Sequence, residues 1–164
     1  MMAPKILNIS IIAGQTPHPE AVFNDLCNRA RGAVDASKWK LALNIIHVSD
    51  DLESIQIAES DTALVTLRAA PKGKVAGFCE LLAGKPGPVG ILGRLLQDNL
   101  ESRSVARSLV RDKTHLKQLR GSAVVVSADP SAIRTVWGLR RQTGAHLVHG
   151  PIAMVHAINV LTGV

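Results

Sequence analysis

The sequence predicts an α/β fold, a doubly wound and mostly parallel sheet of five or six strands with helices on both faces. Short apolar runs rich in Val and Ile alternate with segments that have helical spacing. Several of these runs lack polar alternation, as expected for strands covered on both faces. Pro and Gly punctuate the joins. These features are typical of Rossmann-like or flavodoxin-like domains, and the 164 residues suit a single domain over 1–164.

Six strands are expected, each a run of five to nine residues with few charges. They cover 6–14, 41–48, 62–69, 88–93, 122–128 and 145–149. Five segments between or after them predict helices, because apolar residues recur there at helical intervals. These segments are 20–34, 75–83, 102–120, 131–143 and 151–162.

Proline and glycine mark the ends of the expected helices. Pro17 or Pro19, Pro130 and Pro151 each follow a strand, where a first-turn proline loses no hydrogen bond. Gly121 and Gly144 stand where helices are expected to end. A strand, a helix and a parallel strand in succession imply right-handed crossovers.

Asp112 interrupts the apolar side of the segment 102–120, on which Leu109, Leu116 and Leu119 share one face. A carboxylate in a core contact is costly without a partner. Either the helix ends at Asp112, which then caps a second short helix, or Asp112 pairs with a buried arginine. We favour the break, because Asp is a good cap and a poor interior residue.

The net charge of +6 is concentrated in one stretch. Residues 94–141 hold ten Lys or Arg and four Asp or Glu, which accounts for the whole excess. Within this stretch Arg103, Arg107, Arg111 and His115 follow at intervals of four, on one helical face. The acidic segment 50–61, from this chain or a neighbouring subunit, a phosphate-bearing ligand, nucleic acid or solvent are the candidate partners.

A solvated face is the interpretation that we favour for this arginine stripe. Nucleic acid is the weaker one, because the chain has no Tyr and only two Phe and two Trp on which bases would stack. No helix-turn-helix or zinc-finger signature is present in the sequence.

We expect a cytoplasmic protein without a membrane partner. Cys27 and Cys79 are too few for a disulfide framework. The first residues lack a cleavage site and are expected to enter the first strand. The uncharged run 142–164 is long enough to span a bilayer, but His149 and His156 would lie in hydrocarbon and Gly150-Pro151 divides it.

Ligands of open α/β sheets bind outside the carboxyl ends of the strands, where helix N-termini offer unpaired N–H groups. The residues expected to bind a ligand there are Gly14, Gln15, Thr16, His18, Asp50 and Arg94. Thr16 has two interpretations, as an N-cap of the first helix or as a ligand contact. The segment "GQTPH" is neither a Walker loop nor a GxGxxG motif.

Asp129 and His149 are the candidate catalytic residues. Asp129 precedes Pro130 at a strand-to-helix join, where it predicts an N-cap and, alternatively, a general base. His149 ends the last expected strand and is a candidate acid or base or a structural histidine. We expect no metal site, because no carboxylate or cysteine completes a ligand set with the histidines. The sequence identifies no cofactor and no reaction.

The predicted function is binding, with or without turnover, of a small anionic metabolite, phosphorylated or nucleotide-like, at the carboxyl edge of the sheet. The alternative is a non-catalytic homo-oligomeric interaction protein, or a nucleic-acid-associated module that uses the basic segment 94–141. A homo-oligomer is expected in either case.

Overall fold

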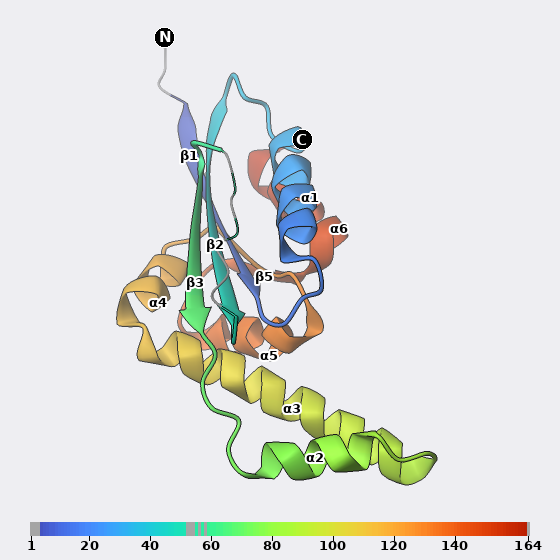
Figure 1. The fold of residues 1–164 in the computed structure, drawn as a ribbon. Helices are drawn as coiled ribbons and strands as arrows, with labels where there is room; N and C mark the ends of the chain where they lie inside the picture. Colours follow the sequence, from blue (N-terminus) through green and yellow to red (C-terminus); the bar gives the residue numbers. More distant parts are fainter. Residues whose placement is uncertain (1–3, 52–54, 56, 58, 164) are drawn as a thin grey trace.

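The computed structural model describes residues 4–51, 55, 57 and 59–163, and within these residues five strands form one parallel sheet. The strand order is β3-β2-β1-β4-β5 (Figure 1). The predicted α/β fold with a parallel sheet is therefore confirmed. The strands are β1 (Lys5–Ala13), β2 (Trp39–Ser49), β3 (Thr62–Arg68), β4 (Val124–Ser127) and β5 (His146–His149).

The central strand β1 determines where the candidate site lies. It pairs with β2 from Lys5 opposite Trp39 to Ala13 opposite His47, and on its other side with β4. Because all strands run the same way, their carboxyl ends meet at one edge. The strand order reverses between β1 and β4, and ligands of such sheets bind beside this reversal.

Helices cover both faces of the sheet, as predicted. One face carries α1 (Pro19–Gly32) and α6 (Gly150–Thr162), whose Phe23 and Met154 pack with Ile9 and Ile11 of β1. The other face, packed on residues such as Ile12, carries α3 (Pro88–Arg111), α4 (Lys113–Arg120), α5 (Pro130–Gly138) and a 3-10 turn, η1 (Leu139–Arg141). Buried side chains on both faces explain why polar alternation is missing from the strands.

The predicted strand 88–93 is wrong, because these residues form the first turns of α3. They pack against α2 (Val75–Ala83) in an antiparallel hairpin. A Cβ at Gly90 would lie 1.8 Å from the Lys85 carbonyl oxygen, and one at Gly93 would lie 2.3 Å from the Ala83 nitrogen. Glycine therefore allows the two backbones to touch. Figure 1 shows that α2 and the first half of α3 project beyond the sheet.

The predicted break at Asp112 is confirmed. Helix α3 ends at Arg111, and the Asp112 carboxylate accepts hydrogen bonds of 3.1 Å from the backbone N–H groups of Thr114 and His115. These bonds cap α4. The basic helix expected over 102–120 is thus two helices, and the first of them begins at Pro88 rather than at 102.

Within the described residues, no helix is both long enough and apolar enough to cross a membrane. Within the uncharged run 142–164, residues 146–149 form β5 and residues 150–162 form α6. His149 is the last residue of β5, and Pro151 lies in the first turn of α6.

Candidate functional site

A hollow of about 520 Å³ opens at the carboxyl ends of β1 and β2, beside the first turn of α1. This volume lies within the roughly 300–1,000 Å³ that small-molecule sites usually have. Three parts of the chain build its wall: the loop after β1, the first turn of α1 and the end of β2. They contribute Gln15, Thr16, Pro19, His47, Ser49 and Asp50, among others.

Helix α1 begins here without a side-chain cap. Its N-cap residue is His18, whose side chain makes no capping hydrogen bond, and Pro19 occupies the first turn. Because Pro19 has no N–H and the Ala21 N–H donates to the His18 carbonyl over 3.1 Å, this helix start offers a ligand the Glu20 N–H and the positive end of the helix dipole. His18 has a φ of 52°, in the left-handed region that costs energy for residues other than glycine.

Thr16 lines the hollow but does not cap α1, so the capping interpretation of Thr16 is wrong. Its N–H donates to the Gly14 carbonyl over 3.0 Å, in a tight turn between strand and helix. The chain offers two prolines, Pro17 and Pro19, as possible first-turn residues, and the helix uses the second.

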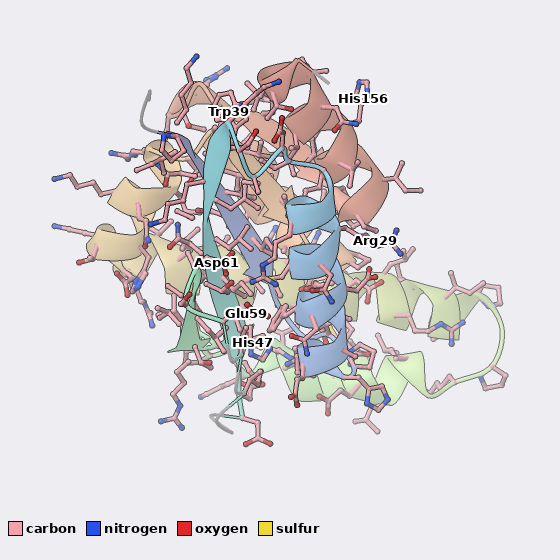
Figure 2. All side chains as sticks on the ribbon, turned by 90° about the horizontal axis from the view of Figure 1, so that it is seen from above. Arg29, Trp39, His47, Glu59, Asp61 and His156 are labelled. Atoms are coloured by element: carbon pink, nitrogen blue, oxygen red, sulfur yellow. The ribbon has the colours of Figure 1, made fainter. Side chains whose placement is uncertain are left out.

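His47 is the buried polar residue of the hollow. It lies two residues before the end of β2. The residue is 5% exposed, and the Nδ1 atom of its ring has no hydrogen-bond partner. Figure 2 shows it beside the start of α1, and its ring meets Phe23 edge to face at 5.5 Å between centroids. Burial lowers the pKa of the imidazole below its ordinary value, although a hydrogen bond with the Gly14 backbone and the charge of Asp129 act to raise it. His47 is therefore neutral at pH 7.

Asp50 gives the hollow an acceptor-rich end. It follows the last residue of β2, and its Oδ2 accepts a hydrogen bond of 3.2 Å from Nε2 of Gln15. Both side chains are exposed, so their outer faces remain open to a ligand. The adjacent Asp51, whose N–H bonds to the Ser49 hydroxyl over 3.1 Å, also lines the hollow.

Asp129 connects the loop after β4 with the loop after β1, the two strands between which the strand order reverses. Its Oδ2 accepts a 2.6 Å hydrogen bond from the Gly14 N–H, and its Oδ1 accepts from the Ser131 N–H and hydroxyl. The predicted N-cap of α5 is thus confirmed. With both oxygens engaged and the residue 6% exposed, Asp129 holds Gly14 in place. Its general-base role stays a prediction.

A second, smaller hollow of about 270 Å³ lies on the α5 side of Gln15. Asp129 and Ser131 line it together with Asp98 and Glu101 of α3. Three carboxylates make this hollow a poor place for a negatively charged group. The α1-side hollow has two carboxylates in its wall, Asp50 and Asp51, and is the less acidic of the two.

His149 lies at the same edge but on β5, beyond β4. Its Nδ1 is 2.9 Å from the hydroxyl of Ser127, which is 1% exposed, and 3.1 Å from the Ser127 carbonyl. A hydroxyl so buried is inaccessible to a substrate, so this pair orients the imidazole. His149 is not among the described residues that line either hollow. Its acid or base role stays a prediction.

Arg94 does not stand at a strand end, as the sequence had suggested. It lies within α3, in the hairpin, where its Nη1 is 3.4 Å from the Ala83 carbonyl. The expectation that it meets a ligand at the sheet edge depended on the strand 88–93 and loses its basis.

The arginine stripe is solvated. Arg103, Arg107 and Arg111 are all exposed on α3. Of the acidic segment 50–61, residues 52–54, 56 and 58 lie outside the described residues, and Asp61 pairs with Arg31 of α1 over 2.6 Å. That pairing draws the end of the acidic segment toward the α1 face of the sheet, away from the stripe.

His47 is a candidate site residue that the sequence interpretation missed. Its signal was a lone histidine in the otherwise apolar run "LALNIIHV", near the end of an expected strand. A position near the end of a strand lies at the carboxyl edge of the sheet, where ligands of open α/β sheets bind.

The described side chains include no group of three or more His, Cys, Asp or Glu arranged to hold a metal ion. The chain matches no family model, no curated protein and no solved structure.

Proposed function

We propose that the protein binds a small, anionic, nucleotide-like metabolite in the hollow between the carboxyl ends of β1 and β2. Gly14, Gln15, Thr16, His18 and Asp50 are the residues that the proposal uses, with His47 added. The cytoplasm, where thiols stay reduced, suits the two buried free cysteines.

One observation carries the proposal: three unlike polar groups surround one hollow. An uncapped helix start, a buried neutral imidazole with an unpaired nitrogen and an exposed carboxylate all line it. A buried polar atom without a partner costs about 1–3 kcal/mol. Proteins keep such an atom where a ligand or water satisfies it.

The two ends of the hollow favour different parts of the ligand. The first turn of α1 offers the Glu20 N–H and the positive end of the helix dipole, which favour a phosphate or carboxylate group. Asp50 and Asp51 repel a second anion and accept hydrogen bonds from hydroxyl groups. A ligand that carries one anionic group and a sugar satisfies both ends, whereas a bare polyanion does not.

His47 lies between these ends and is the natural polar contact for the ligand's middle. A neutral imidazole can donate from one nitrogen and accept at the other. Its burial against Phe23 fixes the ring, so a ligand atom meets a preorganised partner.

Calorimetric titration tests the proposal with four probes: inorganic phosphate, adenosine, adenosine monophosphate and adenosine triphosphate. We expect the monophosphate to bind more tightly than adenosine or phosphate alone, and the triphosphate to gain nothing further. Asp50→Ala, which removes the acceptor, is expected to weaken monophosphate binding about tenfold, the effect of losing one hydrogen bond worth roughly 1.4 kcal/mol.

Asp25→Ala is the matched control. Asp25 is an exposed residue of α1 that pairs with Arg29 over 2.8 Å and does not line the hollow. It removes the same charge from the same face, so its affinity should equal that of the wild type. Equal affinities of the Asp50 variant and the wild type, or no heat with any of the four probes, would refute the proposal.

A further inference from the structure

The hairpin formed by α2 and the first half of α3 exposes an unusual amount of apolar surface. Eight of the thirteen large hydrophobic side chains exposed among the described residues lie between positions 75 and 96, each 40–72% exposed. The eight are Val75, Phe78, Leu81, Val89, Ile91, Leu92, Leu95 and Leu96. A dense apolar patch of this kind on a helix pair is typical of an interaction site and not of an ordinary solvent-exposed surface.

Six of these residues form one continuous surface. At 100° per residue, Val89, Leu92 and Leu96 lie on one side of α3, and Val75, Phe78 and Leu81 lie on one side of α2. The buried Cys79 and Gly93 mark the sides on which the helices face each other. Because the helices are antiparallel, both apolar sides then point the same way, and we call them the apolar hairpin face.

The opposite side of the hairpin is charged. The same geometry places Glu80 of α2 and Arg94 and Asp98 of α3 there. Farther along α3, beyond Leu96, the apolar side gives way to the exposed Arg103 and Arg107. The apolar surface is thus confined to the part of the hairpin that projects beyond the sheet (Figure 1).

We propose that the apolar hairpin face binds the same face of a second copy of this chain, so that two hairpins form a four-helix bundle. A twofold interface of this kind needs one self-complementary patch. The six side chains of this face, each exposing about half of a surface of roughly 150–200 Å², present on the order of 500 Å² per chain, which suits the apolar centre of a standard interface of roughly 800 Å² per partner with a polar rim.

Charge argues for a second copy over a lipid surface. Helices that lie on membranes carry Lys and Arg on their polar side, which anionic lipids attract. Residues 74–98 carry three basic side chains, Lys74, Lys85 and Arg94, against Glu80 and Asp98, and the polar side of the two helices holds one of the three, so the hairpin lacks the row of Lys and Arg that such helices present. A second copy instead buries a face without charges, as in the centre of protein interfaces.

Sedimentation velocity over a concentration series tests the dimer, first on the wild-type chain. We expect a dimer that dissociates on dilution, and a combined Phe78→Glu and Leu92→Glu variant that stays monomeric at every concentration. These side chains are 60% and 54% exposed, so the variant keeps its fold, which circular dichroism verifies. Ile152→Glu, at an 83% exposed position of α6, is the matched control and should dimerise like the wild type.

A monomeric wild type at all concentrations would overturn the proposal, and so would a double variant that still dimerises. Flotation with phosphatidylserine-containing vesicles tests the alternative partner, a lipid surface. Vesicle binding by a monomeric wild type would assign the apolar hairpin face to a lipid surface instead.

Discussion

Gly14 is the residue on which the loop after β1 depends most. A Cβ at this position would lie 1.9 Å from the Ser131 hydroxyl and 2.9 Å from Cγ2 of Val105. Its N–H donates to Asp129, so the backbone here cannot move away without breaking that bond. A side chain is excluded by sterics rather than by backbone conformation.

Gly14→Ala should therefore lower the free energy of unfolding by about 1–3 kcal/mol, the usual cost of overpacking. Urea denaturation measures the loss. Gly32→Ala is the matched control, because nothing lies within 4 Å of a Cβ there and alanine favours a helix by about 0.5–1 kcal/mol. Equal stability of the two variants would show that the loop tolerates a side chain at Gly14.

His47 makes stability depend on pH. Its pKa is lowered in the folded protein, so as pH falls through about 6.5 the unfolded chain binds a proton that the folded protein does not. The free energy of unfolding should fall between pH 7 and pH 5 for this reason. The pKa values of Asp61 and Asp112 are also lowered, by hydrogen bonds, but those carboxylates act in a separate window below about pH 4.

Urea denaturation at pH 7, 6 and 5 measures this dependence. His47→Gln should flatten it, while His156→Gln, on the exposed side of α6, should leave it as in the wild type. The two histidines are labelled in Figure 2. A His47 variant with the wild-type slope would mean that another group takes up the proton.

At the scale of elements, Asp112 separates two helices by capping the second. Its bonds to the N–H groups of Thr114 and His115 need a side-chain acceptor at that position. Asn keeps such an acceptor and Ala does not. The stability order should therefore be wild type, then Asp112→Asn, then Asp112→Ala.

Thermal unfolding at pH 7 checks this order. Asp98→Ala, which removes an exposed carboxylate from the surface of α3, controls for the loss of charge alone. An Asp112→Ala variant as stable as Asp112→Asn would show that α3 and α4 end where they do for another reason.

The hairpin shows where sequence interpretation of an element fails. The run 88–93 contains two glycines, and each costs about 1 kcal/mol relative to alanine inside a helix, which favoured a strand. What makes the helix stable is contact with α2, whose backbone approaches Gly90 and Gly93. Such a contact joins separate segments and leaves no local periodicity. The break at Asp112 was predictable because its capping bonds are local.

At the scale of the whole molecule, the parallel sheet was predictable because Val and Ile runs without alternation require cover on both faces. The strand order was not, because the pairing of β1 with β4 involves residues more than one hundred positions apart. The loop after β1 and Asp50 lie at the carboxyl edge of the sheet, as the sequence predicted, because both directly follow apolar strand runs. His47 was missed because its burial comes from Phe23, a contact between a helix and a strand.

The central claim is that the edge of β1 and β2 binds the ligand, and amide NMR of the labelled protein tests it most directly. Titration with adenosine monophosphate should shift the amide signals of residues 14–21 and 47–51 and leave those of 103–117 unchanged. Shifts confined to 103–117 would assign anion binding to the arginine stripe, and the absence of any shift would contradict a ligand site at this edge.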